Sequence, residues 1–262
     1  MIRGHVEAPV GESGSRTGTV VAPLVAFAVL VGAWAAVVAA LEVPPYLLPG
    51  PVDVASRLAG NPELYATSAL ATLWRILYGG GVGIAGGFAV AVAVVAIRPL
   101  RYALVPYLVT IRVVPKVAVA PPLLIYLGTG RTTAVVFIAL IAFFPICLGT
   151  IAGLDRLDRR YLDLLRSVDA GPIRVMAVRL RFALPEVVSG LKQSVTLAVV
   201  GAIVAEWVVV DGGLGSLVLV ASENLLADVM IAALVVLLLE GLALYGLVVA
   251  VERRLLWYRV PG

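Results

Sequence analysis

The sequence predicts an all-α polytopic membrane protein with about six transmembrane helices. Hydrophobic residues make up 61% of the 262 residues, and charged residues make up only 14%. A soluble globular chain carries about 45–50% apolar and about 25% charged residues, whereas a disordered chain combines low hydrophobicity with high net charge. The composition excludes both classes, and long uncharged runs predict helices that cross a bilayer.

The apolar runs divide the chain into a short tail and one transmembrane domain. Residues 1–19 are polar and rich in Gly and Ser, which predicts a flexible tail. No signal-peptide cleavage site accompanies the first apolar run, so we expect it to be retained as a span. Six spans are predicted, at about residues 20–41, 70–97, 102–127, 132–154, 187–210 and 229–251. Together they form a single domain over residues 20–258.

Local composition sets the character of each element. Four prolines between residues 44 and 51 predict an irregular connection after the first span, because proline lacks an amide donor and fixes φ. Small residues over 79–87 predict close helix packing in the second span, where we also expect Arg75 to extend its charge toward an interface. Four further prolines interrupt the third span, and a tight turn at 128–131 separates it from the fourth.

The distribution of basic residues predicts the orientation in the membrane. An even number of spans places both termini on one side. With that side cytoplasmic, the cytoplasmic segments hold 14 of the 20 Lys and Arg residues, and the opposite loops hold only Arg57 and Arg131. The positive-inside rule therefore predicts a multi-pass membrane protein with both termini in the cytoplasm. Because these charges report topology, they do not indicate a nucleic-acid partner.

The segment 155–186, between the fourth and fifth spans, is rich in arginine. It holds seven arginines, and Leu162, Leu165 and Val168 recur at helical spacing. The turn at 170–172 breaks this helix before a second helical piece at 173–180, and Pro185 is expected to open the fifth span. Two interpretations are open: an interfacial helix held by anionic lipid headgroups, or a docking element for a cytosolic protein.

Five motifs in a fixed order extend over residues 20–258. They are LPGP at 48–51, RVVPKVAVAPPLLIYLGTG at 112–130, RLRFALP at 179–185 followed by GLK at 190–192, GAIVAEW at 201–207, and the glycines at 212–215. This set resembles the permease subunits of binding-protein-dependent ABC importers, in the nitrate, sulfonate and taurine branch. The chain departs from the branch at Arg181, where the usual pattern has proline, and at 166–171, where the acidic-Ala-Ala opening is not intact.

The resemblance implies a type I importer permease with a cytoplasmic coupling helix that inserts into a separate ATP-binding subunit. It also implies an extracytoplasmic substrate-binding protein, a second permease copy, and a small anion (sulfonate or nitrate) or a vitamin precursor as substrate. The ATPase-coupling residues that it implies are Leu165, Arg166, Val168, Asp169, Ala170, Gly171 and Pro172.

Charged residues within the spans are candidates for a pathway or gate, because a charge at the bilayer centre costs at least about 2.5–3.5 kcal/mol. Arg112 and Lys116 are one helical turn apart and would share a face that offers positive potential to an anion. Pro115 interrupts the backbone between them, and Glu206 lies deep in the fifth span. The alternatives are positions near the inner interface or ion pairs at a dimer interface.

Catalysis, metals and cofactors are not expected in this chain. Its single cysteine, Cys147, lies in an apolar run, and its single histidine, His5, lies in the tail. Neither Lys116 nor Lys192 follows a G-x-x-x-x-G run, so ATP is expected to bind to a partner subunit. The alternative function is a self-sufficient secondary transporter or a membrane anchor, neither of which requires the arginine-rich loop.

Overall fold

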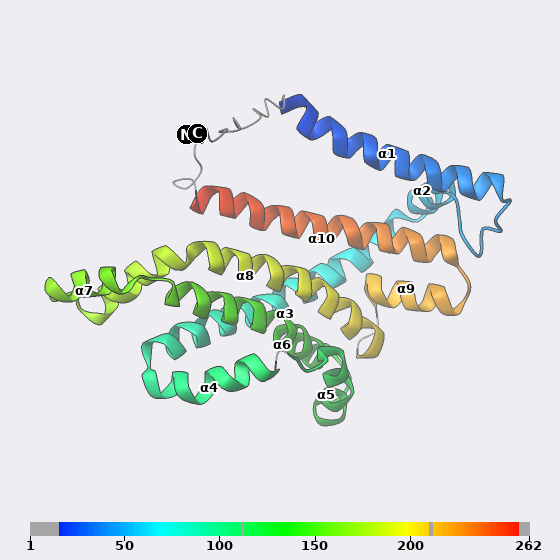
Figure 1. The fold of residues 1–262 in the computed structure, drawn as a ribbon. Coiled ribbons are helices and arrows are strands. Elements are labelled where there is room, and N and C mark those ends of the chain that lie inside the picture. The colour runs from blue at the N-terminus through cyan, green and yellow to red at the C-terminus, as the bar shows by residue number, and fades with distance from the viewer. Residues whose placement is uncertain (1–15, 112, 210–211, 257–262) are drawn as a thin grey trace, which may run out of the picture.

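The computed structural model describes residues 16–111, 113–209 and 212–256, and every regular element in these ranges is a helix (Figure 1). Within them, five helices are long and apolar enough to cross a bilayer: α1 (Arg16–Ala40), α3 (Pro62–Ala96), α6 (Arg131–Asp155), α8 (Pro172–Val208) and α10 (Ala227–Leu255). A sixth candidate span is a bent pair of helices. The all-α membrane fold with about six spans is thus confirmed, whereas residues 1–15 of the predicted tail lie outside the described residues.

The third span is a bent pair of helices, in keeping with the prolines that interrupt it in the sequence. Helix α4 (Arg98–Ile111) is followed by the 3₁₀-helix η1 (Lys116–Val119) and by α5 (Ala120–Leu127), at an angle of 105°. Pro115 explains why α4 stops at Ile111, because a proline cannot donate to the carbonyl four residues earlier and its ring collides with that group.

Helix α8 runs without interruption from Pro172 to Val208, which corrects the predicted break before Pro185. Pro185 lies inside the helix, where it deprives one carbonyl of its usual donor. Close packing against α6 holds the helix together at this level: a Cβ at Gly153 would lie 2.9 Å from the Ala183 Cβ and 3.0 Å from the Ala183 carbonyl oxygen. One rigid helix therefore links the segment after α7 to the middle of the membrane domain.

Helix α6 lies at the centre of the domain, between α3 and α8 (Figure 1). Small residues allow this close approach, as the sequence predicts for 79–87. A Cβ at Gly87 would lie 2.5 Å from the Phe143 carbonyl oxygen, and one at Gly190 would lie 2.8 Å from that of Pro145. Backbone thus packs directly on backbone at both faces of α6, so the three helices form one rigid core.

A buried serine bridges α8 to the backbone of α6. The Ser194 hydroxyl of α8 donates to the Ala142 carbonyl (2.7 Å) and accepts the N–H of Ile146 (3.1 Å), two groups that would pair with each other in an uninterrupted helix. Pro145, which lacks an N–H, lies in the same turn. The inserted hydroxyl satisfies both groups in the dry core and joins α8 to α6.

The two ends of the domain carry different short helices (Figure 1). Helix α7 (Arg159–Ser167) lies at one end, whereas α2 (Pro51–Gly60) and α9 (Leu214–Glu223) lie at the other, beside the start of α10. Arg57 and Asp228 pair at 2.8 Å and tie α2 to α10. Helix α1 stands apart along the outside of the bundle, and none of its apolar membrane window is buried within the chain.

Candidate functional site

The segment between α6 and α8 folds as the predicted helix–turn–helix. Asp158 caps α7, because its Oδ1 accepts the backbone N–H of Arg160 at 3.0 Å. After α7 the chain reverses at Asp169, whose φ of 51° is left-handed, and the Ala170 N–H returns to the Leu165 carbonyl at 2.9 Å. Pro172 then starts α8 in the first-turn position that proline favours.

The structure brings all seven predicted coupling residues together on this turn. Arg166, Val168, Asp169, Gly171 and Pro172 are exposed, whereas Leu165 and Ala170 are half-buried. Apolar exposure is high here, with Ile173 at 86% and Val168 at 66%. An exposed apolar knob at the end of a helical hairpin is a surface suited to another protein, and the docking role of these residues stays a prediction.

Ion pairs anchor the base of this turn to the membrane helices. Arg101 of α4 makes two hydrogen bonds of 2.7 Å to the Asp155 carboxylate at the end of α6. Arg156 pairs with Glu186 of α8. The rings of Tyr161 and Phe182 pack at 5.2 Å and hold α7 against α8. The hairpin is thus attached to three helices rather than hanging as a free loop.

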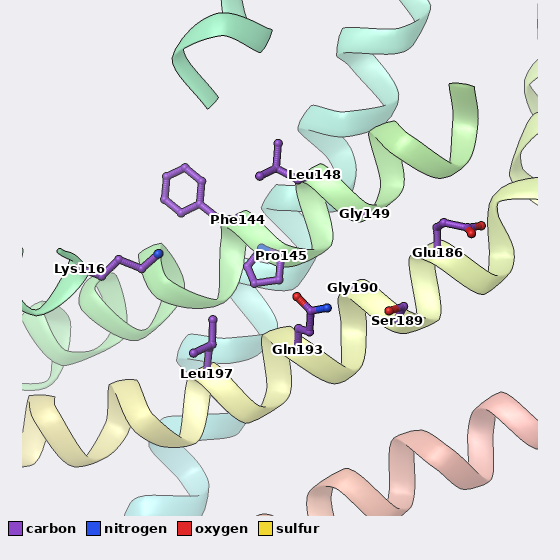
Figure 2. Close-up of a pocket in the computed structure, with 10 residues that line it drawn as sticks. All are labelled: Lys116, Phe144, Pro145, Leu148, Gly149, Glu186, Ser189, Gly190, Gln193 and Leu197. Atoms are coloured by element: carbon purple, nitrogen blue, oxygen red, sulfur yellow. The ribbon is translucent and has the colours of Figure 1, made fainter. Parts of the chain in front are cut away.

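A cavity of about 420 Å³ lies between α6, α8 and η1 (Figure 2). It is lined by Lys116, Phe144, Pro145, Leu148, Gly149, Glu186, Ser189, Gly190, Gln193 and Leu197. Its volume is within the range of small-molecule sites. The bend of the third span is what positions Lys116 here, since η1 begins at that residue, directly after Pro115.

The side of α8 that borders the cavity is polar and exposed. Ser189, Gln193 and Thr196 are all exposed, and their spacing of four and three residues places them on one helical face. Polar side chains in the hydrocarbon region almost always face a water-filled cavity or another protein surface. This face of α8 is therefore unsuited to lipid and fits a solute pathway.

Of the predicted pathway residues that the structure describes, Glu206 lies apart from the neighbouring Pro115 and Lys116. Arg112 lies outside the described residues. Pro115 is at the bend, Lys116 lines the cavity, and Glu206 lies at the far end of α8, near α9. The sequence analysis did not predict Ser189 and Gln193 as pathway residues. Their spacing of four residues on a predicted span indicates a polar helical face that could have been found.

Glu206 is enclosed by three helices. Its side chain has no exposed surface, and its Oε1 accepts hydrogen bonds from the Thr72 hydroxyl (2.8 Å) and from Arg75 (2.6 Å). Its Oε2 accepts the backbone N–H of Gly215 in the first turn of α9 (2.7 Å). The carboxylate joins α3 to α8 and stabilises the start of α9, where the helix dipole favours a negative charge.

Two glycines make room for this carboxylate. A Cβ at Gly213, whose φ is 100°, would overlap the Glu206 carboxylate and would lie 2.5 Å from an Arg75 nitrogen. A Cβ at Gly215 would lie 2.8 Å from Glu206 Oε2. Arg75, which the sequence predicts near an interface, is 12% exposed and pairs with Glu206. The motifs at 201–207 and 212–215 are thus two parts of one cluster.

The described residues contain no group of three or more His, Cys, Asp or Glu side chains that could hold a metal ion. Cys147 is buried in α6. The cavity suits the binding of a solute, and the exposed turn suits the binding of a protein.

Comparison with known proteins agrees with a transport function for these features. The profile of the family described as "Binding-protein-dependent transport system inner membrane component" matches residues 83–257. The chain belongs to this family. It is therefore a multi-pass inner-membrane protein and a permease subunit of an ABC importer, as the sequence motifs predict. Family membership excludes the alternative of a self-sufficient secondary transporter or membrane anchor.

Relatives of the chain cover nearly its whole length. It is 33% identical over 236 residues to a protein of Haemophilus influenzae named "Probable ABC transporter permease protein", covering 90% of this chain and 96% of the relative. It is 32% identical over 225 residues to the riboflavin transport system permease protein of Chloroflexus aurantiacus, covering 85% and 84%. It is 28% identical over 236 residues to the taurine transport system permease protein of Escherichia coli, covering 87% and 86%.

Proposed function

We propose that this permease forms, as a homodimer, the solute pathway of an importer driven by a separate ATP-binding subunit. In this proposal the α7–α8 turn docks on the ATPase, and the cavity beside α8 belongs to the pathway. An extracytoplasmic binding protein delivers the solute at the α9 end. The chain itself carries no catalytic step and needs no cofactor, because ATP is bound and hydrolysed by the partner.

The main support is the continuity of α8. The exposed turn begins this helix at Pro172, and Ser189 and Gln193 of the same helix line the cavity. A displacement of the turn is therefore transmitted to the cavity without an intervening hinge. Since α6 packs backbone to backbone on both α3 and α8, the three helices move together, as in a rigid-body transition.

A second copy explains two surfaces that one chain leaves uncovered. The polar face of α8 at residues 189, 193 and 196 is exposed, and the membrane window of α1 is wholly unburied. In a twofold dimer, the polar faces of two α8 helices would enclose a shared aqueous pathway, which is the setting that intramembrane polar side chains favour.

In the proposed orientation, α7 lies in the cytoplasm. Arginines cluster around this end, at Arg156, Arg159, Arg160 and Arg166, which fits both the positive-inside rule and contact with anionic lipid headgroups. Both termini then lie on the same cytoplasmic side, and α2 and α9 face the binding protein.

A small anion or a vitamin precursor is the proposed solute. Relatives are named as taurine and riboflavin transport permeases. Lys116 places a positive charge at the cavity, and among the described residues no carboxylate lies within ion-pair distance of it. A free cation beside a solute cavity favours substrates with an anionic group.

Substitution of Gly171 tests the docking role. A Cβ at Gly171 would meet no atom within 4 Å, and its φ of −64° suits other residues, so Gly171→Val should leave the permease folded. If the turn fits into a groove on the ATPase, the added branched side chain should reduce recovery of the cognate ATP-binding subunit with the tagged permease by about tenfold, or about 1.4 kcal/mol.

Gly60→Val is the matched control, because Gly60 is equally free of neighbours but lies in α2, at the opposite end of the molecule. It should retain the ATP-binding subunit at the level of the unsubstituted permease. Normal recovery and normal ATP-driven uptake in the Gly171→Val protein would show that the ATPase docks elsewhere.

A further inference from the structure

The cavity beside α8 has two chemically different ends (Figure 2). Lys116 lies at one end, near Phe144, and Glu186 lies at the other, near Gly149, with Gln193 between them. We propose that this cavity holds the solute in transit in one orientation, with an anionic group at Lys116 and a hydrogen-bond donor at the Glu186 end. This inference rests on the proposed function, in which the cavity belongs to the transport pathway.

The Lys116 end is suited to an anion. Its Nζ lies 5.9 Å from the centre of the Phe144 ring, a cation–π contact that orients the ammonium group without neutralising its charge. Each of the ion pairs found in the described chain involves other residues. The ammonium, which can donate three hydrogen bonds, therefore keeps its charge for a sulfonate, carboxylate or phosphate in the cavity.

The Glu186 end is suited to a donor. One carboxylate oxygen pairs with Arg156, whereas Oε2 is buried and has no hydrogen-bond partner among the described residues. A buried acceptor without a partner costs about 1–3 kcal/mol, more when it is charged. The Glu186 side chain lines the cavity and is 21% exposed, so a small rotation of its carboxylate would present this oxygen to an amine, amide or hydroxyl of the solute. The nearby Gln193 amide can accept or donate.

The length of the cavity limits the solute. Phe144 and Gly149 mark its two ends on α6, and five residues of helix rise about 7–8 Å. A volume of about 420 Å³ holds a small molecule together with its remaining water. The ligand class is therefore a small organic anion that carries a donor group at its far end, rather than a symmetric inorganic anion.

Reaction rates of charged thiol reagents report the electrostatic potential at each end of the cavity separately. Gln193→Cys and Ser189→Cys place single reactive thiols toward the Lys116 end and the Glu186 end, respectively, in the assembled importer in membrane vesicles. The probes are anionic 2-sulfonatoethyl, cationic 2-(trimethylammonio)ethyl and neutral methyl methanethiosulfonate. The unsubstituted protein is the blank, because its only cysteine, Cys147, is buried.

The expected result is opposite charge selection at the two positions. At Gln193→Cys the anionic reagent should react faster than the cationic one, relative to the neutral reagent, and adding Lys116→Gln should reduce this ratio about five- to tenfold. At Ser189→Cys the ratio of the anionic to the cationic reaction rate should be lower than at Gln193→Cys, and adding Glu186→Gln should raise it.

The outcomes separate the two proposals. If the neutral reagent modifies neither thiol, the cavity is closed to water and the proposed pathway itself is wrong. If the neutral reagent reacts but Lys116→Gln leaves the charge ratio at Gln193→Cys unchanged, the pathway stands and the oriented binding of an anion is wrong.

Discussion

Glu206→Gln should strongly destabilise the permease, because it removes the charge from a fully enclosed ion pair. The Glu206 side chain has no exposed surface, and Arg75 is only 12% exposed, so water cannot replace the lost partner. The new amide would also direct an N–H₂ group at one of the donors that now serve the carboxylate, namely Thr72, Arg75 and the Gly215 N–H. Breaking such a buried pair costs about 3–5 kcal/mol.

The assay is the free energy of unfolding in mixed micelles, measured by denaturant titration of the purified permease. Arg101→Gln is the matched control. It breaks a well-formed arginine–carboxylate pair whose side chains are 39% and 35% exposed, so its effect should stay below about 1 kcal/mol. Arg75→Met combined with Glu206→Gln should cost less than the sum of the single substitutions, because no buried charge is left unpaired.

A loss below about 1 kcal/mol for Glu206→Gln, or equal losses for it and Arg101→Gln, would refute this reasoning. It would mean that the network around Glu206 does not hold α3, α8 and α9 together.

Substitutions at Gly83 and Ser194, with one at Gly81 as a control, test the helix core. Gly83→Ala should cost about 1–3 kcal/mol of unfolding free energy, because its Cβ would lie 2.8 Å from the Ala139 Cα. Gly81→Ala is the control and should be neutral or stabilising, because its Cβ would meet no atom within 4 Å. Equal effects of the two substitutions in thermal denaturation would contradict backbone-on-backbone packing. Ser194→Ala should cost about 1–3 kcal/mol, because it removes the hydrogen bonds of the hydroxyl with the Ile146 N–H and the Ala142 carbonyl in the core. Unchanged amide exchange at Ile146 would contradict this role.

The sequence predicted best those features of the structure that depend on the residues of a single segment. The membrane class follows from hydrophobic composition, and the small residues at 79–87 predict a close helix contact that the structure confirms on α6. The helix–turn–helix after α6 also follows from local signals, since Asp158 caps its first helix and Pro172 begins the second. The five ordered motifs predict a binding-protein-dependent permease, and the family match over residues 83–257 confirms that prediction.

Prolines show where local rules stop being sufficient. Pro115 ends a helix, whereas Pro145 and Pro185 lie within α6 and α8. The same residue type has different outcomes because neighbours differ: Ser194 supplies hydrogen bonds beside Pro145, and close packing on Gly153 supports α8 near Pro185. These partners are distant in the sequence, so no local pattern could distinguish the three prolines.

Apolar content and motif order determined by themselves that this chain is a helical permease of the inner membrane, because the cost of burying charge in lipid acts on each segment independently. Only the tertiary structure decided which side chains meet. It paired Glu206 with Arg75, 131 residues earlier, and it brought Lys116 and Glu186 to opposite ends of one cavity. Such contacts depend on how a bent span and a continuous α8 pack around α6, and that geometry arises from the whole bundle.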